Sequence, residues 1–401
     1  MAKEKIFSSF GLLPKEEMLE VKPNFKHLQI GIPKESSFQE NRVSLTPDAV
    51  GLLVANGHSV VIEKGAGLAS NFSDSEYTNK GAELAYSKEE VFKANIILKI
   101  EPPTKDELKL IQKGQDLISA LQMSTQSADY FKTLVKKNIT AFGFEFIKDK
   151  HDKLPIVRSM SEIAGNTAIL IAGEYLSNTN NGKGLMLGGI SGLIHTNVVV
   201  IGAGTVGEYA CRTSLGLGAS VIVFDDSVTK LRRLQNNINY RLSTSSLQPK
   251  ALGKALKRAD VVIAALQIGD GKVPCLVSEE MVSEMKKGAV VVDVSIDQGG
   301  CFETSEITSH KQPTFVKHGV VHYCVPNIAS RVSRTASMAI SNIITPILLR
   351  IAEEGGVENT IRKHDSLRKG VYVFHGNLTN RVLSKNFNIP FVDLDLIMAR
   401  R

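Results

Sequence analysis

The residues with the clearest chemical meaning are three glycines that follow an apolar run. Val198 to Ile201 leads directly into Gly202-x-Gly204-x-x-Gly207, and a helical pattern follows. In a βα unit that binds a dinucleotide, the first glycine permits a tight turn and the second lets the backbone approach a pyrophosphate. The third lets the helix pack closely on the strand, and the helix N-terminus offers positive potential to the phosphates. The alternative is a structural turn in an α/β sheet, because glycine-rich turns are common.

A second apolar strand with an acidic end extends this motif. The run ASVIVFD, residues 219–225, ends in Asp225, about where an acidic side chain accepts hydrogen bonds from an adenosine ribose. A carboxylate at this position repels a 2′-phosphate, so the pattern favours NAD over NADP. We therefore predict NAD as the cofactor, with a site that includes Gly202, Gly204, Val206, Gly207 and Asp225.

Composition limits the class of protein. The chain has 401 residues, 43% of them hydrophobic and 22% charged, as expected of two globular domains. Its net charge of +7 is modest and its basic residues are dispersed, which argues against nucleic-acid binding. No uncharged apolar run reaches about 18 residues and the start is not a secretory signal, so we expect no membrane span. Four cysteines without CxxC spacing indicate reduced thiols in a cytoplasmic protein and no metal site.

The elements that must position these residues are strands and helices in alternation. One series of apolar strands lies between residues 28 and 147, and a second between residues 197 and 325. Long helical runs, at 160–178 and 335–356, flank the second series. The tail after residue 356 is too short for a core of its own and should rejoin the first domain. The pattern predicts an α/β fold with two Rossmann-like, doubly wound domains joined by two long helices.

Ligands of open α/β sheets bind beyond the carboxyl ends of the strands. A cleft between the two predicted domains should therefore hold both cofactor and substrate.

Several sequence blocks resemble the alanine dehydrogenase and nicotinamide nucleotide transhydrogenase family, in the family order. They run from about Gln29 to Pro390 and include IGIPKESSFQENRVSLTP, MSEIAG, LMLGGISG, VVVIGAGTVG, KKGAVVVDVSIDQGGCFE and TFVKHGVVHYCVPN. The resemblance implies an NAD-binding domain, residues 156–333, inserted into a catalytic domain formed by residues 28–155 and 334–401. Residues 1–27 would be an N-terminal extension. It also implies a small amino-acid or oxo-acid substrate and a homo-oligomer, a hexamer or a dimer.

The resemblance also implies roles for individual residues. Arg42 matches an arginine that holds the substrate carboxylate, which suits the forked guanidinium. Asp297 matches a carboxylate that faces the substrate amine and the nicotinamide, and Asn327 lines the same cleft. The alternatives are a surface arginine beside a helix cap and an Asx turn at a strand end. Around the cofactor, the resemblance implies ribose contacts from Asp225 and Lys230, a pyrophosphate contact from Ser161 and a nicotinamide-ribose contact from Leu266.

Two catalytic positions depart from the family pattern. The family places a catalytic lysine in K-x-K-E-P, where this chain has KIEPP at 99–103, so Glu101 replaces the lysine. The acid/base histidine of the family corresponds to Gln122, which cannot titrate. Asp297 and Glu101 remain as possible bases, because burial can tune a carboxyl group toward neutrality. Lys99 lies on the same strand face as Glu101 and is expected to reach partly into the site.

We therefore predict an NAD-dependent amino-acid dehydrogenase that resembles alanine dehydrogenase, with an atypical catalytic set. Such an enzyme converts L-alanine reversibly to pyruvate and ammonia by hydride transfer to NAD. Two alternatives remain open. One is a transhydrogenase-like NAD(H)-binding subunit that works with a separate partner. The other is an NAD-binding homologue without deaminase chemistry, or with another amino-acid substrate.

Overall fold

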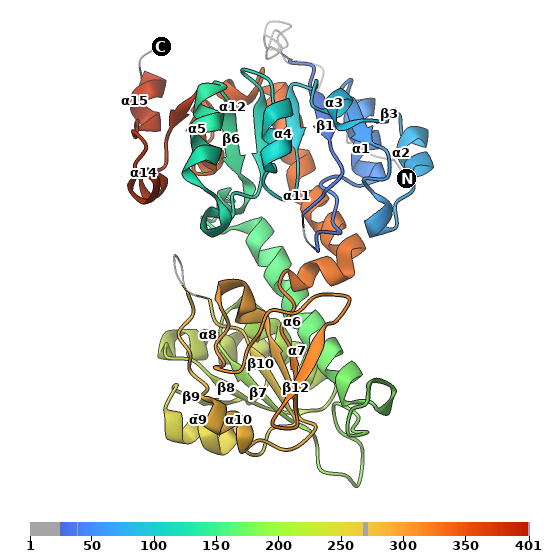
Figure 1. Ribbon diagram of the computed structural model, residues 1–401, viewed down its shortest axis with the longest axis vertical. Helices are drawn as coiled ribbons and strands as arrows, with labels where there is room; N and C mark the ends of the chain where they lie inside the picture. The colour runs from blue at the N-terminus through green and yellow to red at the C-terminus, as the bar shows by residue number, and fades with distance from the viewer. Residues whose placement is uncertain (1–24, 38, 268–271, 400–401) are drawn as a thin grey trace, which may run out of the picture.

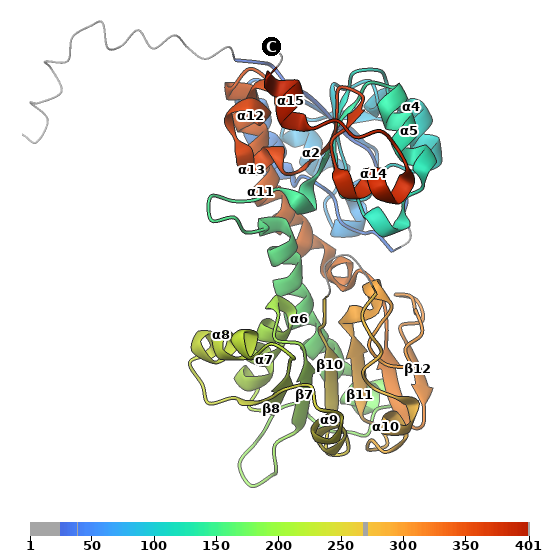
Figure 2. The same cartoon turned by 90° about the vertical axis from the view of Figure 1, so that its left-hand side faces the viewer.

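Two lobes joined by two long helices make up the molecule (Figures 1 and 2). The computed structural model describes residues 25–37, 39–267 and 272–399, so the predicted N-terminal extension lies almost wholly outside them. The long helices are α6 (Pro155–Leu176) and α11 (Ser333–Glu353). The predicted α/β architecture of two Rossmann-like lobes is confirmed, whereas the domain boundaries stay a prediction.

The first sheet has the strand order β15-β14-β6-β5-β4-β1-β2-β3. Strands β1 to β6 pair in parallel, and β14 pairs antiparallel with β6. The C-terminal tail therefore rejoins the first lobe, as predicted, but by an antiparallel edge. The strands are β1 (Gln29–Ile32), β2 (Ser59–Glu63), β3 (Glu83–Ala85), β4 (Ile96–Leu98), β5 (Asp116–Ser119), β6 (Thr140–Gly143), β14 (Val371–Phe374) and β15 (Asn377–Leu378).

The second sheet has the strand order β12-β13-β11-β10-β7-β8-β9 and is parallel except at β12. The glycine motif follows β7 at the centre of this sheet, where the strand order reverses. The strands are β7 (Asn197–Ile201), β8 (Ser220–Phe224), β9 (Ser243–Ser245), β10 (Val261–Ala264), β11 (Val290–Asp293), β12 (Thr314–Lys317) and β13 (Val320–Tyr323).

Helices pack around both sheets, and their ends follow local capping rules. In α1 the Thr46 side chain accepts from the Ala49 amide and Pro47 occupies the first turn. The first lobe holds α1 (Pro47–Ala55), α2 (Asp74–Asn79), α3 (Lys88–Val91), α4 (Lys105–Leu110), α5 (Ala128–Lys136), α12 (Val357–Lys363), α13 (Asp365–Arg368), α14 (Arg381–Phe387) and α15 (Leu394–Ala399). The second holds α7 (Thr205–Gly216), α8 (Val228–Ile238), α9 (Pro249–Leu256) and α10 (Glu279–Ser283).

The long helix α6 belongs to both hydrophobic cores. Ile156 is buried in the core of the first lobe, whereas Ala164 and Ala168 are buried in that of the second. Gly165 allows α6 to approach α7 closely, because a Cβ there would lie 2.4 Å from the carbonyl oxygen of Val206. The second lobe is thereby fixed to the end of a helix that begins in the first lobe.

One helical stretch of the described residues, Ile328–Glu353, is long and apolar enough to cross a membrane. Half of its most apolar window is buried, and Ile340, Ile344 and Leu348 lie in the first core. Core helices of globular lobes show the same burial, so this stretch is weak support for a membrane span. All four cysteines are free, and three are buried, as the sequence suggested.

Candidate active site

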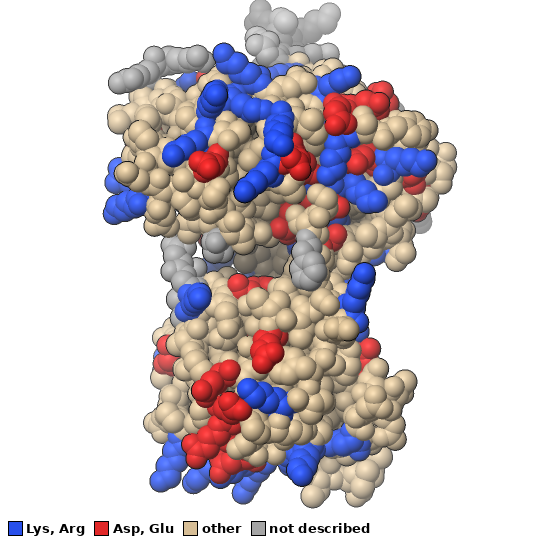
Figure 3. All heavy atoms as spheres, in the orientation of Figure 1, with Lys and Arg blue, Asp and Glu red and all other residues tan. Residues whose placement is uncertain are grey.

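The site lies where the two lobes meet, and Figure 3 shows a hollow between them. The segment after β1 contacts the residues that follow β13. The Asn41 amide donates to Ser330 Oγ at 2.9 Å, and that hydroxyl donates to the Gln39 carbonyl at 2.7 Å. These contacts hold the neighbouring Arg42 against the second lobe.

Arg42 takes part in a buried ion pair. Its Nε donates to Glu40 Oε1 at 2.8 Å and its NH2 group to Glu40 Oε2 at 2.5 Å. The same NH2 group lies 3.6 Å from Glu101 Oε1, and NH1 faces the Met160 sulfur at 3.5 Å. The guanidinium predicted to hold a substrate carboxylate is thus already paired on one edge. Sequence reasoning missed Glu40, which lies two residues before Arg42.

Glu101 has an unusual protonation equilibrium. Burial raises the pKa of Glu101 to about 8, and the nearby charge of Glu40 acts in the same direction, against Arg42. Burial also acts to raise the pKa of Glu40, but the charge and hydrogen bonds of Arg42 bring that pKa below its usual range. One of the two neighbouring carboxyl groups is therefore protonated near neutral pH.

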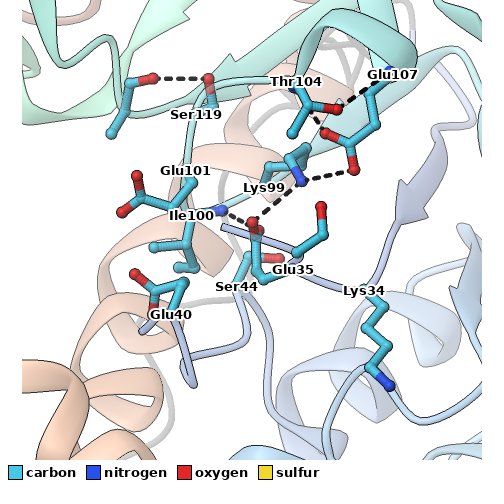
Figure 4. A network of polar contacts seen from close by, with 12 residues as sticks. Lys34, Glu35, Glu40, Ser44, Lys99, Ile100, Glu101, Thr104, Glu107 and Ser119 are labelled. Atoms are coloured by element: carbon cyan, nitrogen blue, oxygen red, sulfur yellow. Dashed lines mark hydrogen bonds and ion pairs between the residues drawn. The ribbon is translucent and has the colours of Figure 1, made fainter. Parts of the chain in front are cut away.

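Lys99 does not extend toward Arg42. Its side chain is fully buried, and its Nζ lies 3.1 Å from Glu35 Oε2 and 3.3 Å from Glu107 Oε1 (Figure 4). Glu107 also pairs with Lys88 at 2.6 Å, and Glu35 accepts from the Ile100 amide at 2.6 Å. The expectation that Lys99 reaches into the site is wrong, because two buried carboxylates hold its ammonium inside the first lobe.

Gln122 follows β5, and Glu101 follows the neighbouring strand β4, but the Gln122 side chain is exposed. Its backbone is left-handed, with φ of 44°. Glu145 stabilises this turn, since its Oε1 accepts from the amides of Leu121 at 2.7 Å and Gln122 at 3.2 Å. The other Glu145 oxygen is buried without a hydrogen bond, and burial raises the pKa of this carboxyl group. Sequence reasoning did not single out Glu145, which comes from a different strand end.

Asp297 and Asn327 reach the site from the second lobe. Asp297 follows β11, and its Oδ1 accepts from the Asn327 amide at 3.0 Å. The Asn327 side chain donates to Glu40 Oε2 at 2.9 Å. Surrounding protein atoms raise the pKa of Asp297, while the Asn327 amide and the charge of Arg42 oppose the rise. The structure thus brings together four predicted residues, Arg42, Glu101, Asp297 and Asn327, through Glu40.

The glycine loop has the form that a dinucleotide requires. A Cβ on Gly202, where φ is +112°, would lie 2.4 Å from the Ala265 carbonyl oxygen, and one on Gly207 would lie 1.9 Å from that of Gly202. A Cβ on Gly204 would meet nothing within 4 Å, so the backbone there faces open space at the start of α7. This open backbone at a helix N-terminus fits a pyrophosphate.

Asp225 supports this loop from the end of β8. It is 1% exposed, and its carboxylate accepts from the Ala203 amide at 2.7 Å and the Ser227 amide at 2.8 Å. Arg233, which the sequence did not single out, donates to the Ala203 carbonyl at 2.9 Å. The predicted ribose-binding acid therefore also holds the glycine loop in shape.

The other predicted cofactor contacts lie around the same loop. Lys230 is exposed in the first turn of α8, and Val206 lies in the first turn of α7. Leu266 follows β10, and its amide donates to Ser295 Oγ at 2.9 Å. Ser161 is half-buried on α6, next to Met160. Their contacts with a cofactor remain predictions.

Two α/β lobes, a glycine loop at a helix N-terminus and a charged cleft define the class of dinucleotide-dependent oxidoreductases. Within this class, the chain belongs to the alanine dehydrogenase/PNT family. The model of the family's N-terminal domain matches residues 31–164, and that of its C-terminal domain matches residues 168–381. The family suggested by the sequence blocks is thereby confirmed, and with it the assignment to the dehydrogenase enzymes.

Known proteins are similar to this chain over nearly its full length. The alanine dehydrogenase of Bacillus subtilis (strain 168) is 38% identical over 364 residues, which cover 90% of this chain and 96% of that protein. That of Methanococcus maripaludis is 39% identical, with 90% and 97% covered. A solved L-alanine dehydrogenase superposes with a TM-score of 0.83 at 34% identity, covering 90% of this chain and 99% of that one. A transhydrogenase from Sinorhizobium meliloti shares the fold, with a TM-score of 0.74 at 23% identity over 88% of this chain and 99% of that one.

Proposed function

We propose that this chain is an NAD-dependent amino-acid dehydrogenase that converts L-alanine reversibly to pyruvate and ammonia. The observation that carries the proposal is the contact path from Asp297 through Asn327 and Glu40 to Arg42. It joins a carboxylate suited to a substrate amine with a guanidinium suited to a substrate carboxylate. The relatives named alanine dehydrogenase support the same substrate.

We assign the substrate carboxylate to the NH1 group of Arg42, which Glu40 does not contact. Glu40 occupies Nε and NH2, whereas NH1 faces only the soft sulfur of Met160. In the oxidative direction, NAD held along the glycine loop would supply the acceptor for the hydride that leaves the substrate α-carbon. Asp297 takes a proton from the substrate ammonium, which leaves a neutral amine that can become an imine. Water then adds to the imine, and ammonia leaves.

The remaining proton transfers involve Glu101, with Gln122 as a non-titrating neighbour. A carboxyl group whose pKa is about 8 both donates and accepts protons readily near neutral pH. Glu101 can therefore accept a proton from the water as it adds and return that proton to the amine as ammonia leaves. Gln122 offers only hydrogen bonds to the substrate or to water, because its amide does not ionise.

NAD would bind along the glycine loop of the second lobe. We assign the pyrophosphate to Gly202, Gly204, Val206 and Gly207 with Ser161, the adenosine ribose to Asp225 and Lys230, and the nicotinamide ribose to Leu266. The fit rests on the open backbone at Gly204 and the carboxylate at the end of β8. That carboxylate favours NAD over NADP. We place the boundaries of this cofactor domain at residues 156 and 333.

We further propose a cytoplasmic homo-oligomer, a hexamer or a dimer. Apolar side chains are exposed on α6 and on the loop after it, including Leu170 at 61%, Leu193 at 66% and Ile194 at 96%. A second copy of the chain would cover such a surface. Sedimentation of the purified protein tests the oligomeric state.

Steady-state kinetics test the proposed reaction. Purified protein should reduce NAD with L-alanine at alkaline pH and should oxidise NADH with pyruvate and ammonia. NADH binding without turnover in either direction would contradict the proposal. It would favour a transhydrogenase-like NAD(H)-binding subunit, or a homologue without deaminase chemistry. Turnover with other amino acids alone would correct the substrate but not the enzyme class.

A further inference from the structure

Two carboxyl groups share one guanidinium at the centre of the site. The NH2 group of Arg42 lies 2.5 Å from Glu40 Oε2 and 3.6 Å from Glu101 Oε1. The side chains of Arg42 and Glu101 are each 10% exposed, and that of Glu40 is 0% exposed. One positive charge therefore faces two acidic groups in surroundings that screen charge poorly.

Among the described residues, Lys34 lines the same cavity as Glu40 and Arg42, but it is not among the largest influences on the pKa of Glu101. Lys99, two residues before Glu101, is shared between Glu35 and Glu107. Glu35 adds a negative charge that acts on Glu101, and from the second lobe Asp297 faces Arg42. Two close carboxyl groups under these conditions do not both ionise, so one keeps a proton.

Hydrogen bonds decide which group keeps the proton. Glu40 accepts from Nε, NH2 and the backbone amide of Arg42, and also from the Asn327 side chain. Four N–H donors stabilise the ionised form of Glu40. Glu101 lies beyond hydrogen-bond distance of the guanidinium. Glu101 is therefore the protonated member, and its O–H can donate to Glu40 or to a ligand.

We propose that protonated Glu101 donates a hydrogen bond to the substrate carboxylate or carbonyl where the family has a lysine, so that the oxo acid binds together with one proton. This inference rests on the proposed function and concerns the same cleft. Neutral Glu101 adds a donor 3.6 Å from the NH2 group of Arg42. Ionised Glu101 instead adds a negative charge that repels the anion.

The protonation of Glu101 determines how the affinity for the oxo acid changes with pH. The pKa of Glu101 is about 8 in the free protein, and a bound carboxylate favours the protonated form and raises this pKa further. Binding therefore takes up a proton above about pH 8, and affinity falls about tenfold per pH unit there. Below about pH 8 the affinity depends little on this group.

Calorimetry on the NADH-loaded enzyme tests the inference, with pyruvate as the probe and no ammonia. Titrations in two buffers of different ionisation enthalpy, on both sides of about pH 8, report the protons exchanged. Wild-type protein should take up protons and lose affinity as the pH rises. Glu101→Gln, which keeps a neutral donor, should bind pyruvate with a flat pH profile. Asp116→Asn is the control, because burial raises the pKa of Asp116 to about 7 at the opposite end of the adjacent strand β5, and the profile should not change.

Pyruvate binding that does not depend on pH in the wild-type protein would overturn the inference alone, and so would a pH slope that persists in Glu101→Gln. Release of protons on binding, together with a preference for L-lysine over L-norleucine, would overturn it too. The last result would mean that the acidic pair selects a cationic substrate. Absence of pyruvate binding at every pH, with NADH still bound, would overturn the proposed substrate as well. An infrared difference spectrum between wild type and Glu101→Gln near neutral pH should show the carbonyl band of a protonated carboxyl group, and its absence would also reject the inference.

Discussion

The Asn327 side chain of the second lobe donates a 2.9 Å hydrogen bond to Glu40 of the first, the same carboxylate that orients Arg42. One glutamate therefore takes part both in a contact between the two lobes and in the orientation of the proposed substrate arginine. We expect substrate binding to be coupled to the position of the second lobe.

Asn327→Ala should raise the KM for L-alanine more than it lowers kcat. A hydrogen bond to a charged group contributes about 1.5–3 kcal/mol, which corresponds to a loss of roughly tenfold or more in kcat/KM. Ser330→Ala is the matched control, since Ser330 also bridges the lobes but bonds Gln39 and Asn41. Steady-state kinetics of both variants distinguish the two. If both variants changed KM and kcat equally, Asn327 would act only by holding the two lobes together.

Glu101→Lys combined with Gln122→His should raise turnover of L-alanine. The pair restores a cation and a titrating imidazole at adjacent strand ends, and general acid/base catalysis contributes about a hundredfold or more. Each single variant serves as a control, and the gain should need both changes. Unchanged kcat in the double variant would show that these positions do not match the family's catalytic pair.

Gly204→Ala should weaken NAD binding without loss of stability. The added methyl group meets no protein atom within 4 Å, and the residue has φ of −75°, so the fold tolerates it. The methyl group would occupy the space that we assign to the pyrophosphate, and NADH affinity should fall about tenfold or more. Gly216→Ala, near the end of the same helix and also open, is the control. Fluorescence titration with NADH and thermal unfolding measure the two effects, and full affinity in Gly204→Ala would place the cofactor elsewhere.

Lys99→Met should destabilise the first lobe by about 3–5 kcal/mol, because it leaves Glu35 and Glu107 buried without their shared cation. Burial acts to raise the pKa of Glu107, but Lys99 and Lys88 bring it below the usual 4.5. The stabilisation from the contact of Lys99 with Glu107 is therefore present above about pH 4.5 and is lost as the pH falls through the lowered value. Burial raises the pKa of Glu35, so its contact with Lys99 is lost at a higher pH. Urea unfolding at several pH values should show the gap between wild type and variant narrowing in acid. Lys109→Met is the control, since its salt bridge is exposed.

The features that could be predicted from the sequence are those that depend on residues within a single helix, strand or turn. The glycine loop, Asp225 and the long helix α6 follow local rules of turn geometry and periodicity, so the sequence predicted them. Glu40 and Glu145 were missed because their roles depend on neighbours from other segments. The wrong expectation for Lys99 has the same cause. Strand alternation predicts the face on which a side chain lies, but it does not predict which carboxylates from other segments lie on that face.

The helix α6 also joins the two lobes beside the site. It is buried in the first core at Ile156 and in the second at Ala164, which is a little over two turns further on. Met160 packs against the first core and faces the Arg42 guanidinium. The hydrogen bond from Asn327 to Glu40 joins the lobes on a separate connection. One continuous helix thus forms a wall of the site, and both lobes share it as a common support for Arg42.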